Sequence, residues 1–225
     1  MTRTTAKRHG RWRVTVFEIV VVVVVLAVLA GMLLPAWARW REENRRSRCP
    51  RNLNCLAKGM VMYLDAFGDR RWYPCPLGRG KTQGNYNGAE WLASLYWTGV
   101  IADPEVFICP SSGDDNDGGR QLGRDRAIPG LFGSQTVSYA GLHYYSLRDD
   151  EGRPMVGAIA ADYPPNRVMA SDDTQGDINH GTLQGGGMIV LFFDGHVEFR
   201  VQCEIDLIAG VGATGEDELL RDLRN

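Results

Sequence analysis

Two histidines and several aspartates in the last third of the chain have side chains that could bind a metal ion or take part in hydrolysis. His180 precedes a glycine-rich stretch that leads to Asp194-Gly195-His196, and three further acids stand before it, Asp172, Asp173 and Asp177. Carboxylates and imidazoles are common ligands of divalent cations. Asp-Gly is, however, a strong signal for a short hairpin turn, in which both residues need a positive φ.

We therefore favour a structural role for this motif. In this interpretation Asp194-Gly195 is a turn between two strands, His196 points outward, and His180 hydrogen-bonds to the backbone of the glycine-rich stretch. The acidic tract 114–117 resembles a calcium loop in composition, but it lacks the closing Glu of an EF-hand, so we interpret it as a solvated turn. We assign no catalytic residue, no metal and no cofactor, and we do not expect an enzyme.

A single acid stands near the start of a membrane-length apolar segment. Glu18 is followed by 20 uncharged residues, 19–38. As a helix they span roughly 30 Å, the thickness of the hydrocarbon core of a bilayer. A carboxylate beside lipid is costly, about 2.5–3.5 kcal/mol for Asp at a helix centre and less near an end. We therefore expect Glu18 to meet a cationic group inside the membrane.

The charge distribution indicates an exported body. Residues 1–58 carry 12 Lys/Arg and 3 Asp/Glu, whereas residues 59–225 carry 13 Lys/Arg and 24 Asp/Glu, a net charge of −11. Basic residues precede the apolar segment without any acid, so the positive-inside rule predicts a single-pass protein of the inner (cytoplasmic) membrane with a cytoplasmic N-terminus and a periplasmic C-terminal domain. A cleaved secretory signal is the alternative, because Ala36-Trp37-Ala38 resembles a cleavage site. The acidic body argues against nucleic acid as a partner.

The apolar periodicity predicts one long helix from about Val14 to Phe67, which Pro35 should kink and Pro50 should break or bend. We expect a short helix at 90–99 and a short helix or a frayed end at 215–225. The strand candidates are 137–142, 155–161, 167–171, 188–193 and 196–201. A long helix that lies across a small antiparallel sheet is an α+β fold.

This organisation divides the chain into four parts. Residues 1–13 form a basic cytoplasmic leader and residues 14–39 a transmembrane helix, and residues 40–67 continue the helix as an amphipathic segment. Residues 68–225 form the exported α+β domain. We expect the first half of the helix to be in contact with membrane lipid.

The N-terminal segment resembles the processing signal of the type IV pilin-like (pseudopilin) family. Glu18 and Pro35 have the family's spacing, and Val14 matches the first residue of the mature chain, which a prepilin peptidase releases and methylates. The resemblance implies a pilin-like fold and contact with like or related subunits through the N-terminal helix, with Glu18 meeting the N-terminal amine of a neighbour. Arg13 stands where the family nearly always has glycine.

The rest of the chain is similar to prepilin-like proteins with a C-terminal histidine-to-Asp-Gly motif, the DUF1559 type. The motif corresponds to His180 and Asp194-Gly195, and its spacer has 13 residues here, which is longer than in the group. The other matching segments are Cys49 with Asn52-Leu53, Tyr63, 107–111 and Ser138-Tyr139. This resemblance implies architecture and location rather than an activity.

Five cysteines are present, and an exported domain can form disulfides. Cys49 and Cys109 both lie in family-like segments, and a bond between them would close a 61-residue loop. Such a loop adds roughly 4 kcal/mol of stability in the chain-entropy model. Cys75–Cys109 is the rival pairing, and Cys55 could be a small buried residue. No Cys-x-x-Cys pair occurs, which weakens a zinc or redox motif.

These observations predict a pilin-like or pseudopilin-like subunit of a type II secretion or type IV pilus-like assembly. Arg13 favours a first alternative, an unprocessed, membrane-anchored binding protein of the cell envelope that does not assemble. A second alternative is an exported metal-dependent enzyme that uses His180 and Asp194.

Overall fold

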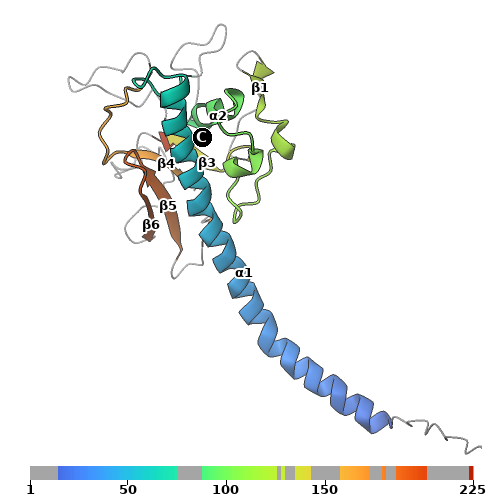
Figure 1. Cartoon of the computed structure of the whole chain (residues 1–225). Helices are drawn as coiled ribbons and strands as arrows, with labels where there is room; N and C mark the ends of the chain where they lie inside the picture. The colour runs from blue at the N-terminus through green and yellow to red at the C-terminus, as the bar shows by residue number, and fades with distance from the viewer. Residues whose placement is uncertain are drawn as a thin grey trace, which may run out of the picture. The chain divides into compact units, whose positions relative to one another are not determined.

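The computed structural model describes residues 15–75, 88–125, 128–129, 135–142, 158–172, 179–180, 186–201 and 223–224. The chain divides into two compact units, Met1–Arg41 and Glu42–Asn225. Figure 1 shows the helices and strands along the chain. Together they confirm the predicted α+β composition of a long N-terminal helix and a small antiparallel sheet.

Helix α1, Val16–Ala66, has 51 residues and confirms the predicted long N-terminal helix. The side chains of its apolar first part are exposed from Val16 to Leu34. Among the described residues it is the one helix that is long and apolar enough to cross a membrane, judged by length and composition. The prediction of a membrane-length helix is therefore supported by length and composition.

Both prolines lie inside α1, and the helix is continuous through them (Figure 1). Of the predicted break or bend at Pro50, the break is wrong, because α1 runs unbroken from Val16 to Ala66. Proline removes one N–H from the helical ladder, but its neighbours Cys49 and Leu53 are fully buried. Their packing in the core stabilises the helical path on both sides of Pro50.

The second part of α1 is amphipathic, as predicted. Its buried side chains recur at three- and four-residue spacings, Cys49, Leu53, Leu56, Met60 and Tyr63. Residues on the opposite side, such as Val61 and Met62, are exposed. This spacing places one stripe of the helix in the core and leaves the other stripe in solvent.

The main sheet has five strands in the order β6-β5-β4-β3-β7, and every neighbouring pair is antiparallel. The strands are β3 Tyr139–Leu142, β4 Val168–Asp172, β5 Gly187–Phe192, β6 Val197–Val201 and β7 Leu223–Arg224. They confirm four of the predicted strands, those starting near 137, 167, 188 and 196. Two short strands, β1 Gly123–Asp125 and β2 Ile128–Pro129, form a separate two-stranded sheet.

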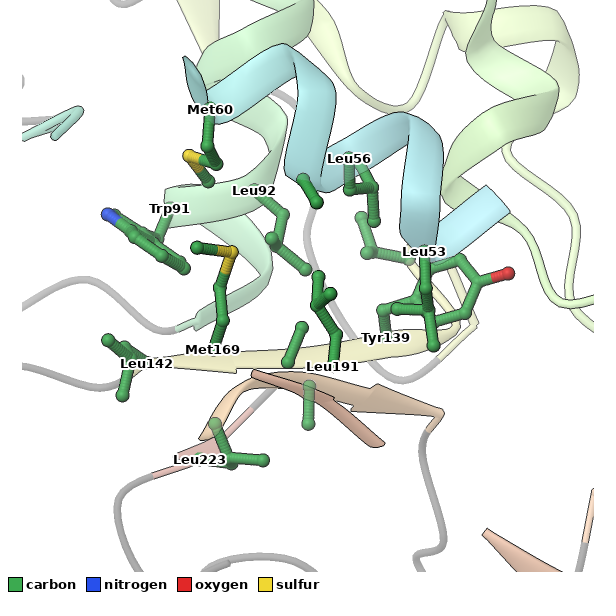
Figure 2. Packing of buried hydrophobic residues seen from close by; sticks show 14 of the residues in the cluster. Leu53, Leu56, Met60, Trp91, Leu92, Tyr139, Leu142, Met169, Leu191 and Leu223 are labelled. Atoms are coloured by element: carbon green, nitrogen blue, oxygen red, sulfur yellow. The ribbon is translucent and has the colours of Figure 1, made fainter. Parts of the chain in front are cut away.

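Helix α2, Gly88–Trp97, confirms the predicted short helix and lies against β3, and side chains of α1 and α2 meet above the strands (Figure 2). Figure 2 shows Leu53, Leu56 and Met60 of α1 beside Trp91 and Leu92 of α2, above the strands. All five side chains are fully buried. Two short 3-10 helices, η2 Pro104–Phe107 and η3 Asp117–Gly119, follow α2.

The β5–β6 hairpin contains the predicted Asp194-Gly195 turn, but not the expected turn type. Only Gly195 has a positive φ, 87°, whereas the two-residue turn needs positive φ at both positions. The N–H of Gly195 donates to the carbonyl oxygen of Phe192 at 2.9 Å. The chain therefore turns over Phe192–Gly195, with glycine supplying the left-handed residue, and β6 begins at Val197.

The C-terminal prediction is wrong for its described residues, because Leu223 and Arg224 form strand β7 beside β3 rather than a helix or a frayed end. Leu223 is fully buried, and this burial holds the segment on the sheet. Of the strand predicted at 155–161, residues 155–157 lie outside the described residues, and Ala160 forms a single bridge with Trp72.

Candidate functional site

Four chemically reactive side chains meet in the core of the second unit. Their ligand atoms all lie within 4.8 Å of one another, and all four residues are buried. We call this group the buried cluster; it consists of Cys49, Cys109, Asp172 and His180. Its members come from four separate segments of the chain.

Each segment is held in place by packing or by hydrogen bonds. Cys49 lies on the buried stripe of α1. The residue before Cys109, Ile108, accepts hydrogen bonds through its carbonyl oxygen from Asn52 Nδ2 at 2.9 Å and from the Tyr139 hydroxyl at 3.3 Å. These two contacts connect the Cys109 loop to α1 and to β3.

Asp172 and His180 are positioned by the sheet. Asp172 ends β4, and its Oδ1 accepts a hydrogen bond from the backbone N–H of Ile189 in β5. The carbonyl oxygen of His180 accepts one from the N–H of Gly187 at 3.0 Å. Only glycine fits at position 187, because a Cβ there would lie 2.1 Å from the carbonyl oxygen of Arg200.

The imidazole of His180 is central to the cluster. Its Nε2 lies 3.4 Å from Cys109 Sγ and 3.3 Å from Asp172 Oδ2. Its Nδ1 lies 3.8 Å from Glu42 Oε1, which also accepts a hydrogen bond from the Ser111 hydroxyl at 3.0 Å. Neither Asp172 Oδ2 nor His180 Nδ1 has a hydrogen-bond partner in the structure.

Burial and mutual contact perturb the pKa values of the cluster in opposite directions. A hydrogen bond from Cys49, together with His180, lowers the pKa of Cys109 to about 5. Burial raises the pKa of Cys49 well above its usual value and that of Asp172 to about 8. Burial opposes protonation of His180, but Cys109 and the carboxylates of Asp172 and Glu42 outweigh it and raise its pKa.

This arrangement can do two kinds of chemistry. Two sulfur atoms, one nitrogen and one oxygen converge, which is a donor set suited to a metal ion. Alternatively the two thiols, which are free in the structure, could be oxidised to the disulfide that sequence analysis considered. The structure places Cys109 beside Cys49, and Cys75 is not part of the cluster. Cys203 lies outside the described residues.

The histidine-to-Asp-Gly motif does not form one site. His180 is fully buried, whereas Asp194 is at the exposed tip of the hairpin. Asp194 Oδ1 accepts a hydrogen bond from the N–H of His196 at 3.0 Å and contacts its Nδ1. The turn interpretation of Asp194-Gly195 therefore agrees with the structure. The side chain of His180 contacts Cys109 and Asp172 in the buried cluster, and residues 181–185 of the glycine-rich stretch lie outside the described residues.

The acidic tract is organised by its own hydrogen bonds. Asn116 Oδ1 accepts from the N–H of Gly119 at 3.1 Å and caps η3, and Asp115 Oδ1 accepts from the N–H of Asp117 at 2.9 Å. Asn116 Nδ2 also donates to the carbonyl oxygen of Pro104 at 2.7 Å. These contacts give the tract a structural explanation that needs no ion.

Glu18 has a partner that was not predicted from the sequence, the residue just before the start of its own helix. Its Oε2 accepts hydrogen bonds from the backbone N–H of Thr15 at 2.8 Å and from the Thr15 hydroxyl at 3.1 Å. Thr15-Val16-Phe17-Glu18 matches the capping-box pattern, which could have been recognised from the sequence. Glu18 therefore stabilises the start of α1 even without a cationic neighbour, and Pro35 lies in the exposed apolar part of the same helix. Arg13 and Val14 lie outside the described residues.

Comparison with known proteins gave no relatives. No family model, no curated protein and no solved structure matches the chain.

Proposed function

We propose that the chain is a membrane-anchored, pilin-like subunit of a type II secretion or type IV pilus-like assembly. The observation that carries the proposal is helix α1, which combines an exposed apolar first part with an amphipathic second part buried in an α+β body. Among the described residues, the apolar side chains of this first part are exposed. Lateral contact with lipid or with like helices would cover them.

The proposed mechanism is assembly rather than catalysis. Subunits are stored in the inner membrane through the apolar segment and pack laterally through their helices. Glu18 would set the register of neighbouring helices through one buried charge pair, a role documented for buried polar groups in other helical assemblies. The capping contact with Thr15 supports this role, because it holds the carboxylate at the helix start.

A second candidate function rests on one residue, Arg13, which stands where the pilin-like signal has glycine. A chain that keeps its leader stays anchored in the membrane and would serve as a binding protein of the cell envelope. The body would then face the periplasm as a monomer. The two candidates differ in whether residues 1–13 remain on the mature protein.

The intact mass of the protein purified from its native membrane tests the proposal. We expect a mass that begins at Val14, with or without one added methyl group, because extraction into an assembly requires removal of the basic leader. A mass that includes residues 1–13 would contradict the assembly proposal and support the anchored binding protein. An Arg13→Gly variant is the control, since it restores the family's residue before the cut and shows whether the peptidase of the host can act on this chain.

A further inference from the structure

We propose that the buried cluster binds one zinc ion in a closed, tetrahedral site. This site is independent of the proposed function, because every ligand lies in the second unit of the chain. The residue patterns alone led to no metal assignment, and the enzyme alternative placed a metal at His180 with Asp194. Asp194 is not part of the site proposed here.

The donor set selects zinc among common cations. Cysteine sulfur, histidine nitrogen and aspartate oxygen are the three ligand types of protein-bound zinc. Calcium and magnesium require oxygen ligands in larger number, which the cluster does not offer. A tetrahedral site with two sulfur atoms is typical of zinc.

Two of the distances between ligand atoms match edges of a zinc tetrahedron. With usual bond lengths, a sulfur and a nitrogen bound to one zinc are about 3.6 Å apart, and a nitrogen and an oxygen about 3.4 Å apart. The corresponding distances from His180 Nε2 are 3.4 Å to Cys109 Sγ and 3.3 Å to Asp172 Oδ2. The imidazole nitrogen therefore already has the separations that a shared ion would impose.

An ion would also satisfy a buried oxygen that makes no hydrogen bond to the described residues. Asp172 is fully buried, and its Oδ2 makes no hydrogen bond in the structure. Buried polar atoms are nearly always paired, since leaving one unpaired forfeits its interaction with water. The other oxygen, Oδ1, is bound to the N–H of Ile189, so Oδ2 is the oxygen free to coordinate.

The second ring nitrogen of His180 lies near a carboxylate, which is a usual neighbour of a zinc-bound imidazole. Its Nδ1 lies 3.8 Å from Glu42 Oε1, and Glu42 is fixed by the hydroxyl of Ser111. A carboxylate behind a ligating histidine fixes the tautomer and makes the ring a better ligand. Glu42 is thus assigned as a positioning residue outside the four ligands.

The site has a structural rather than a catalytic character. All four ligand residues are buried, so no coordination position is open to substrate or water from solvent. The ligands come from α1, the loop after η2, the end of β4 and the bridge at His180. One ion would therefore crosslink the amphipathic part of α1 to the sheet.

The competing state is a disulfide between Cys49 and Cys109. Zinc binding requires both sulfur atoms as thiolates and releases their protons, whereas a disulfide forms by two-electron oxidation and removes both sulfur atoms from coordination. The two states exclude each other. The oxidation state of these cysteines in the native protein therefore decides the proposal.

The experiment measures metal content and thiol state together on the full chain in detergent, purified from its native membrane without chelator or reductant. We expect one zinc per chain, and we expect Cys49 and Cys109 to react with an alkylating reagent only after a chelator is added. Removal of zinc should also lower the thermal unfolding midpoint. A Cys49–Cys109 disulfide overturns the proposal, as does a chain with free thiols that takes up no added zinc.

Two pairs of variants locate the ion. Asp172→Asn keeps the size of the side chain and should lose zinc, whereas Asp194→Asn in the exposed hairpin should retain it. Glu42→Gln should weaken zinc affinity about 10–100-fold, the usual effect of losing an outer carboxylate, while its exposed neighbour Glu43→Gln should not. Glu42 is half-buried, so this second pair stays informative if Asp172→Asn fails to fold. Equal zinc affinity in both members of the Glu42 and Glu43 pair would remove Glu42 from the site, and full zinc content in Asp172→Asn would overturn the proposed ligand set.

Discussion

At the tip of the β5–β6 hairpin, the carboxylate of Asp194 accepts a hydrogen bond from the N–H of His196 and contacts its ring. The backbone hydrogen bond, followed by the ring contacts, lowers the pKa of Asp194 below its usual value of 3.8. A carboxyl group whose pKa is lower in the folded state stabilises the fold above its ordinary pKa. This contribution is lost as the pH falls through the lowered value.

We therefore predict that Asp194→Asn is slightly less stable than the wild type at neutral pH, and that the difference is lost as the pH falls below 3.8 and through the lowered pKa of Asp194. Thermal unfolding of both proteins across this pH range measures the effect. Asp162→Asn, a change at another exposed aspartate, should follow the wild type throughout. A difference between wild type and Asp194→Asn that stays constant with pH would mean that the charge of Asp194 has no role in the turn.

Single residues show where sequence reasoning succeeds and where it ends. The role of Asp194-Gly195 as a turn could be predicted, because the dipeptide itself carries the conformational preference. The buried cluster could not, because 60 residues separate Cys49 from Cys109 and a further 63 separate Cys109 from Asp172 in the numbering of the chain. No local spacing in the sequence predicts that these side chains lie together, because their proximity depends on how α1 packs on the sheet. Two separate signals pointed toward members of the buried cluster: the resemblance singled out Cys49 and Cys109, and the residue types singled out His180 and Asp172 as possible metal ligands.

Helix α1 contributes a stripe of buried side chains to the core, and its two faces differ sharply in the second half. Leu53 is fully buried, whereas Val61 is 58% exposed. Leu53→Ala should lower the free energy of unfolding by about 2–5 kcal/mol, since it deletes buried methyl groups and leaves a cavity in the core. Val61→Ala should change it by less than about 0.5 kcal/mol. Denaturant unfolding of the full chain in detergent, followed by tryptophan fluorescence, compares the two variants.

Equal stability of these variants would contradict the packing of this part of α1 on the sheet domain. The prediction is specific because both residues lie in one helix and differ in which stripe they occupy. A general weakening of the helix would affect both, while loss of a core contact affects Leu53 alone.

Helices and strands with a clear local sequence pattern could be predicted. Elements that form only because they pair with a distant strand or pack in the core could not. The alternation of β6 and the apolar run of β5 predicted their strands, because each pattern has the period of a half-buried or a buried strand. Strand β7 has two residues and exists because Leu223 pairs with Leu142 of β3. The continuity of α1 through Pro50 was likewise decided by the buried neighbours of the proline rather than by its local preference.

At the scale of the whole molecule, the two units of the chain have opposite character. The first contains the exposed apolar stretch of α1, and the second contains the core and all four ligands of the buried cluster. In the proposed function, the first unit supplies contacts in the membrane and the second supplies the outer surface of the assembly. In this function Glu18 has two roles: it caps its own helix, and its charge pairs with a neighbouring subunit.

Replacing Glu18 in two ways separates these roles. Glu18→Gln keeps the capping box, because glutamine also accepts from the N–H at the helix start, but it removes the charge. Glu18→Ala removes both. If the charge pairs with a neighbouring subunit, both variants should impair assembly when co-expressed with the wild-type chain, as measured by the yield of high-molecular-weight complexes after crosslinking in the membrane. If Glu18 only caps its helix, Glu18→Gln should behave as the wild type and Glu18→Ala should lower helix stability alone. A monomeric anchor would show no effect of either variant on a co-expressed wild-type chain.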